Sequence, residues 1–127
     1  MVVPCLDFFP ADAFYVPGRP VWAAFFENPG LVQFMHRMAG YLLLLFGVVV
    51  WLRARRSPYA VTRRAFGAVG VMLVAQLGLG IFTALTAASL PVAISHQIGA
   101  VILWVLILRA RHFAQYPMAG SIREGTA

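Results

Sequence analysis

The chain has 127 residues, of which 61% are hydrophobic and 11% are charged, and its mean hydropathy is +0.82. Soluble domains rarely have such a composition, and the long uncharged runs indicate segments that lie within a lipid bilayer. The net charge of +6 comes from ten arginines against four acidic residues. Because the arginines bracket apolar runs and do not form one basic face, they predict membrane topology and argue against a nucleic-acid partner.

Residues 1–30 are rich in proline and aromatic residues. Their charges are one basic and three acidic side chains, which gives −2: Arg19, Asp7, Asp12 and Glu27. The prolines prevent a long helix, and the aromatic rings suit a segment that lies on a membrane surface. Cys5 is the single cysteine, so no disulfide can form within the chain. Residues 28–30 are expected to form a turn into the first long helix.

Three apolar runs are each long enough to cross a membrane. We expect helices over residues 31–52, 65–86 and 91–108. Pro91 suits the first turn of the third helix, because its missing N–H loses no hydrogen bond there. The predicted fold is an all-α membrane protein. It consists of an extracytoplasmic segment (1–30), a three-span helical bundle (31–112) and a flexible cytoplasmic or matrix tail (113–127).

Arginines gather at one end of the predicted spans. Five lie between the first and second spans, and two directly follow the third: Arg53, Arg55, Arg56, Arg63, Arg64, Arg109 and Arg111. The positive-inside rule places this end in the cytoplasm or the mitochondrial matrix. We therefore expect an integral protein of the bacterial cytoplasmic membrane or the mitochondrial inner membrane, surrounded by the lipid bilayer.

An ionisable pair, His36 and Arg37, lies inside the first apolar run, where a polar group is costly and indicates function. His96 occupies the matching place in the third run. Each histidine is five residues from the start of its span, and these two spans run in the same direction. Both should therefore lie at one depth, about 7–8 Å below the outer helix ends. We predict that they are the two axial ligands of one heme iron.

Small residues beside the histidines favour this prediction. Gly40 follows His36 by one helical turn, and Gly99 follows His96 by three residues, which leaves a flat strip for a porphyrin face. Arg37 either pairs with a heme propionate or extends to lipid phosphates. The alternative for the histidines is interhelical hydrogen bonding. Zinc is disfavoured, because no Cys, Asp or Glu accompanies them at the spacing of a tetrahedral site.

Other polar residues of the spans receive structural interpretations. Gln76, Thr83 and Gln97 are expected to be hydrogen-bond partners between helices. His112, among the terminal arginines, is expected to be a solvated residue of the membrane interface. No Gly-rich phosphate loop and no Ser/His/Asp arrangement is visible, so no catalytic residue is predicted.

Two segments, NPGLVQFMHRMAGYLL and AQLGLGIFTALTAASLPVAISHQIGAVILWVLIL, resemble the C-terminal half of heme A synthase. With the basic loop between them, the resemblance covers about residues 20–113. That family has eight spans in two similar four-helix halves and oxidises the C8 methyl group of heme O to a formyl group, which gives heme A for terminal oxidases. The resemblance implies that His36 and His96 hold heme b, in an incomplete four-helix heme-binding bundle.

The resemblance covers the sixth to eighth spans of the family, and Gln33 stands where the family's substrate half carries a glutamate. A glutamine amide does not titrate, so it cannot act as a base. We therefore expect a truncated or split product that binds heme b without making heme A alone. Its expected partner is the missing N-terminal half or a second copy; heme O synthase and terminal-oxidase assembly factors are further candidates. Two alternatives stay open: a free-standing membrane b-type cytochrome for electron transfer, and a structural subunit whose histidines serve helix packing.

Overall fold

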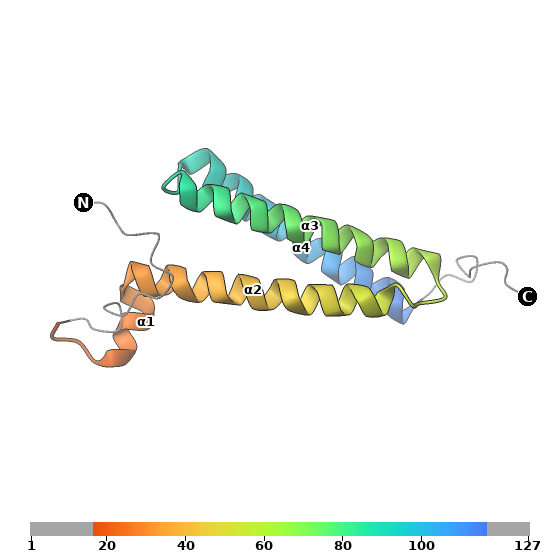
Figure 1. Ribbon diagram of the computed structural model, residues 1–127, viewed down its shortest axis with the longest axis horizontal. Helices are drawn as coiled ribbons and strands as arrows, with labels where there is room; N and C mark the ends of the chain where they lie inside the picture. Colours follow the sequence, from red (N-terminus) through yellow and green to blue (C-terminus); the bar gives the residue numbers. More distant parts are fainter. Residues whose placement is uncertain (1–16, 117–127) are drawn as a thin grey trace, which may run out of the picture. The chain divides into compact units, whose positions relative to one another are not determined.

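The computed structural model describes residues 17–116, which form helices joined by short turns (Figure 1). A 3-10 turn, η2 (Val21–Ala23), and a short helix, α1 (Ala24–Glu27), are followed by three long helices. These are α2 (Pro29–Ala54), α3 (Ala60–Leu85) and α4 (Leu90–Gln115). The chain divides into two compact units, residues 1–43 and 44–127. Cys5 and residues 117–127 of the predicted tail lie outside the described residues.

The three long helices have the dimensions and composition of membrane spans. Each has 26 residues and is apolar enough to cross a membrane. At 1.5 Å per residue each is about 39 Å long, which exceeds the hydrocarbon core of about 30 Å and reaches the head groups. Their outer faces are apolar too, since Val71, Leu42 and Trp104 are 74%, 64% and 66% exposed. The prediction of an all-helical membrane protein with three spans is confirmed.

Two predicted helix boundaries were wrong. α3 begins at Ala60, five residues before the predicted start, so that Arg63 and Arg64 are helical. α4 continues to Gln115, seven residues past the predicted end, and includes Arg109 and Arg111. The predicted limits follow the apolar runs, and the arginines lie outside them because charge is costly in hydrocarbon. Near a membrane surface, however, the backbone can stay helical while the long side chain carries its charge to water.

The predicted turn at residues 28–30 is the N-terminal cap of α2. The side-chain Oδ1 of Asn28 accepts hydrogen bonds from the backbone N–H groups of Gly30 (2.9 Å) and Leu31 (3.3 Å). Pro29 is the first helical residue, where its fixed φ suits the helix and its missing N–H is not needed. Leu31 is buried together with Ala24 of α1, which anchors the short helix to the start of α2.

The turn between α3 and α4 lies where the sequence predicts it. Ala87 and Ala88 have left-handed backbone conformations, with φ of 48° and 56°. The N–H of Ala88 donates to the carbonyl of Thr83 at 2.8 Å, which closes the end of α3. α4 then begins at Leu90, and Pro91 lies in its first turn as expected.

α3 and α4 pack side by side as an antiparallel hairpin (Figure 1). Their buried residues repeat at intervals of three, four and seven, which is the spacing of a coiled-coil seam: Thr62, Val69, Leu73 and Gln76 on α3, and Gly99, Leu103 and Ala110 on α4. The second half of α2 packs on this hairpin, because an added Cβ at Gly47 would overlap the side chain of Leu73.

Thr62 and Phe113 connect the two helices at the arginine-rich end of the hairpin. Thr62 is 5% exposed, and its hydroxyl donates to the backbone carbonyl of Phe113 at 3.1 Å. This carbonyl belongs to the last turn of α4, where the helix itself supplies no donor. The hydrogen bond therefore satisfies a helix end and sets how far α4 slides along α3.

Candidate functional site

His96 lies in the second turn of α4, half-buried and turned toward α3. Its imidazole rests on Gly80 of α3. A Cβ built on Gly80 would lie 3.3 Å from Cε1 of His96 and 3.8 Å from its Nε2. The first distance is tighter than most Cβ contacts in proteins, so a side chain at position 80 would push the ring away. The glycine thus provides the space in which the imidazole lies.

Gln76, one helical turn before Gly80, fixes the backbone that carries the imidazole. Its side-chain Nε2 donates to the backbone carbonyl of His96 at 3.1 Å. Gln76 is 7% exposed, and its Oε1 is buried without a hydrogen-bond partner among the described residues. A buried amide of this kind is costly unless it is hydrogen-bonded, so Gln76 favours the one alignment of α3 and α4 that satisfies its donor.

Gly99 makes room for this glutamine. It is buried, and an added Cβ there would overlap Nε2 of Gln76 and lie 3.2 Å from Cε of Met72. The sequence predicts that Gly99 lies under a porphyrin, whereas the structure shows Gln76 and Met72 of α3 packed against it. The small residue that faces the ring of His96 is Gly80, on the neighbouring helix. A heme-binding role for Gly99 stays a prediction.

Sequence reasoning along α4 alone missed the part of the site that α3 supplies. The available signal was the spacing of Gln76 and Gly80, which are four residues apart and therefore on one helix face. Gln76 is an interhelical hydrogen-bond partner, as predicted. Thr83 is not: its hydroxyl donates to the carbonyl of Leu79 in its own helix at 2.7 Å. A threonine hydroxyl reaches the carbonyl four residues earlier without leaving the helix.

His36 and Arg37 lie in the second turn of α2, in the first unit of the chain. His36 is exposed, and Arg37 is half-buried. Gly40 follows one turn later, and a Cβ added there would meet no side chain of residues 17–43 within 4 Å. An open strip thus lies beside His36 within its own unit. The coordination of one iron by His36 and His96, and the contact of Arg37 with a propionate, stay predictions.

The remaining polar residues of α4 are at its surface. Gln97 is exposed, and its predicted role between helices stays a prediction. His112 is exposed, as expected, and its ring centroid is 5.2 Å from that of Tyr116. Neither residue belongs to the cluster of Gln76, Gly80 and His96.

Residues 3–108 match the model of the COX15-CtaA family, described as cytochrome oxidase assembly protein. The chain belongs to this family. The matched residues include both segments from which the resemblance was inferred, so the sequence-based assignment is confirmed. They also include Gln76, Gly80, His96 and Gly99, so the contacts among these four residues lie within the matched segment.

Three bacterial relatives of this chain carry the name heme A synthase. The relative from Cereibacter sphaeroides (strain ATCC 17029 / ATH 2.4.9) is 53% identical over 126 residues, which is 94% of this chain and 32% of the relative. The relative from Paracoccus denitrificans (strain Pd 1222) is 62% identical over 102 residues, 80% of this chain and 27% of the relative. The relative from Ruegeria sp. (strain TM1040) is 56% identical over 115 residues, which is 91% of this chain and 30% of the relative. The chain therefore spans about a third of these relatives' length. No solved structure matches it.

Proposed function

We propose that this chain is part of a heme A synthase and provides its heme b site, with His36 and His96 as the two axial ligands. The observation that carries the proposal is the arrangement at His96, where Gly80 admits the ring and Gln76 holds its backbone. Imidazole is a normal axial ligand of heme iron. The name heme A synthase of the relatives supports a role in heme A biosynthesis. The family resemblance implies that the reaction is the oxidation of the heme O C8 methyl group.

Several residues on the described helices support the proposal of a heme site. A ligating histidine needs a fixed ring orientation, which commonly comes from a hydrogen bond made by its second ring nitrogen. The Nδ1 of His96 is buried, and so is the Oε1 of Gln76, the residue whose Nε2 donates to the backbone carbonyl of His96. Gly40 offers an open strip beside His36, and the guanidinium of Arg37 suits a carboxylate. Heme b supplies a reversible one-electron couple when bound.

Optical spectra of the purified chain test the heme site. We expect a reduced low-spin b-type spectrum from the wild type. His36→Ala and His96→Ala should each remove one axial ligand and give high-spin heme or none. His112→Ala is the matched control, because His112 is exposed at the other end of α4, and it should leave the spectrum unchanged. A low-spin spectrum that survives unchanged in both single variants contradicts the proposal, and so does a wild type without heme.

Complementation tests the place of this site in heme A synthesis. The chain is expressed with the N-terminal part of the Paracoccus denitrificans relative, in a host that makes heme O and lacks heme A synthase. We expect heme A in the extracted hemes, and none when His96→Ala replaces the wild type. If the chain binds heme but no combination yields heme A, an electron-transfer cytochrome is the better assignment.

The arginine-rich ends of the helices are proposed to face the cytoplasm of a bacterial cell. Five arginines lie at the end of α2, in the connection to α3 or at the start of α3, and two more lie in the last turns of α4. The α3–α4 turn, at the opposite end of the hairpin, carries no charged residue, so the positive-inside rule places the arginine-rich end inside. With Cys5 replaced by serine, an impermeant maleimide should label Ser89→Cys in intact cells. Arg56→Cys should react only after lysis. The opposite pattern would reverse the orientation.

A further inference from the structure

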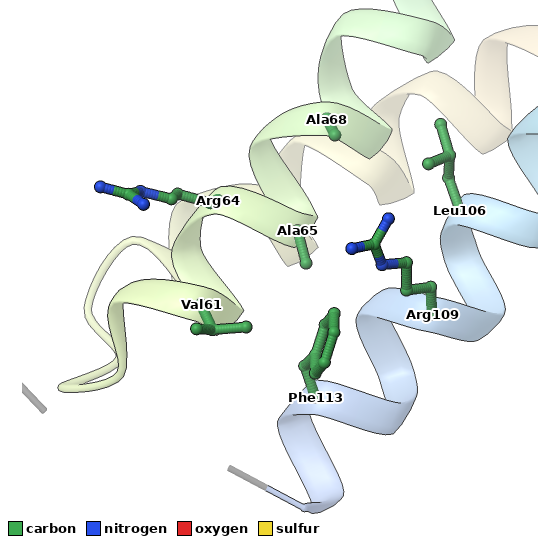
Figure 2. A pocket seen from close by; sticks show the side chains of 7 residues that line it. All are labelled: Val61, Arg64, Ala65, Ala68, Leu106, Arg109 and Phe113. Atoms are coloured by element: carbon green, nitrogen blue, oxygen red, sulfur yellow. The ribbon is translucent and has the colours of Figure 1, made fainter. Parts of the chain in front are cut away.

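A groove lies between α3 and α4 at the arginine-rich end of the hairpin (Figure 2). Its volume is about 350 Å³. The small side chains of Ala65 and Ala68 leave this space on the α3 side, and Leu106 and Phe113 form the α4 side. The groove is therefore apolar along its length.

One charged group points into this apolar groove. Figure 2 shows the side chain of Arg109 reaching from α4 toward Ala65, and its guanidinium carbon lies 5.4 Å from the ring centroid of Phe113. Arg64 extends from α3 at the side of the groove, away from its centre (Figure 2). Both arginines are exposed. The groove thus has an apolar body and a basic mouth.

The sequence offers these arginines no carboxylate on their own helices. Residues 28–116 contain eight arginines and no aspartate or glutamate. Glu27 is the nearest acidic residue before them. Its Oε1 forms an ion pair with a guanidinium nitrogen of Arg19, 3.2 Å away. At a membrane surface the abundant anion is the phosphate of a lipid, and basic pockets between spanning helices are typical sites for it.

Two neighbouring arginines have structural partners instead. The guanidinium of Arg63 donates to the backbone carbonyls of Ser57 at 2.8 Å and Pro58 at 3.1 Å, which holds the loop before α3. Arg55 stacks on Trp51, with its guanidinium carbon 4.8 Å from the ring centroid. Arg109 also contacts a ring, that of Phe113, but both Arg109 and Phe113 line the groove, and Arg64 lies beside it.

We propose that this groove binds one anionic phospholipid. The lipid phosphate contacts Arg109, and one acyl chain lies along Ala65, Ala68 and Leu106. Arg64 adds a positive charge at the side of the groove. Free phosphate would gain nothing from the apolar walls, so the expected occupant is the whole lipid. Arg109 is thirteen residues after His96, about 20 Å along α4, so the groove is separate from the proposed heme site.

Native mass spectrometry of the full chain in neutral detergent tests the groove, with added phosphatidylglycerol or phosphatidylcholine of identical acyl chains. We expect retention of one phosphatidylglycerol in preference to phosphatidylcholine. An arginine near a membrane surface contributes about 1 kcal/mol to the attraction of anionic lipid, so Arg109→Gln should weaken binding about fivefold. Arg111→Gln is the matched control. It removes the same charge from the same helix end but does not line the groove.

Ala68→Phe tests the acyl-chain part of the groove without a change of charge. Ala68 is exposed, so the larger side chain fills the groove and not the helix–helix core, and helicity by circular dichroism should be unchanged. We expect it to weaken phosphatidylglycerol binding as well. Equal retention of the two lipids overturns the proposal. So does an equal effect of Arg111→Gln and Arg109→Gln, a binding-neutral Ala68→Phe, or displacement of the lipid by inorganic phosphate.

Discussion

Gly99 and Gln76 should be strongly coupled in their contribution to stability. In Gly99→Ala, the new methyl group takes the place of Nε2 of Gln76, so the hydrogen bond to the carbonyl of His96 is lost. Overpacking costs about 1–3 kcal/mol, and an interhelical hydrogen bond in a membrane contributes about 0.6 kcal/mol on average. The higher helix propensity of alanine offsets about 1 kcal/mol. The net destabilisation should be about 2 kcal/mol.

The same substitution should have the opposite effect when Gln76 is alanine. Gln76→Ala removes the side chain that the new methyl group would overlap. The Cε of Met72, 3.2 Å away, is the end of a flexible side chain and can move into the vacated space. Only the helix-propensity gain of about 1 kcal/mol remains. The effect of Gly99→Ala should therefore differ by about 3 kcal/mol between the two backgrounds.

A double-mutant cycle measures this coupling. The unfolding free energies of the four variants are obtained by titrating mixed micelles with SDS and following helicity by circular dichroism. Gly78→Ala serves as the control, because Gly78 is exposed and an added Cβ meets no described atom within 4 Å. Gly78→Ala should not lower the unfolding free energy, whether residue 76 is glutamine or alanine. Effects of Gly99→Ala that agree within about 0.5 kcal/mol would show that Gln76 does not fill this position.

Two further substitutions test the hairpin. Thr62→Val should cost about 1–2 kcal/mol, because Thr62 is buried and the substitution removes the donor to the backbone carbonyl of Phe113. Thr83→Val should cost less by the same SDS titration, because the hydroxyl of Thr83 bonds within its own helix. Equal costs would refute the interhelical role. Gly80→Ala should leave stability nearly unchanged but alter the optical spectrum of bound heme, because its methyl group displaces the ring of His96, whereas Gly78→Ala should not.

The sequence predicts the number and type of the helices because apolar runs mark the segments that lie in lipid, and arginine blocks mark the segments that reach water. α2 extends two residues beyond its prediction at either end. The start of α3 and the end of α4 were predicted wrongly for a physical reason. Hydropathy measures the preference of side chains for hydrocarbon, whereas a helix ends where its backbone hydrogen bonds end. At a membrane surface, the helix therefore continues one or two turns beyond the end of the apolar run.

The site could be predicted only in part. His96 was recognisable as an ionisable residue within an apolar helix, and Gln76 as a polar residue that needs a partner. The partner itself, the backbone carbonyl of His96, has no sequence signal because every residue carries a carbonyl. The contact of Gly80 with the imidazole depends on the alignment of α3 with α4, which neither helix encodes alone.

That alignment has its cause in the polar and small residues of the hairpin. In lipid, apolar side chains such as Val69 and Leu103 gain little by facing each other, because lipid tails are equally apolar. These apolar contacts therefore do not fix how far α4 is shifted along α3. The hydrogen bonds from Thr62 and Gln76 start about 21 Å apart on α3 and end on two backbone carbonyls of α4.

A slide of α4 by one turn would move the carbonyls of Phe113 and His96 away from Thr62 and Gln76 and bring carbonyls of other α4 residues to their places. It would also move Gly99 away from Gln76 and bring a bulkier residue of α4 against the glutamine. The packing of Gln76 against Gly99 therefore favours the observed alignment, because a glycine leaves room for the glutamine side chain. The depth of the His96 imidazole in the membrane is therefore set by α3, through residues that do not themselves bind a cofactor.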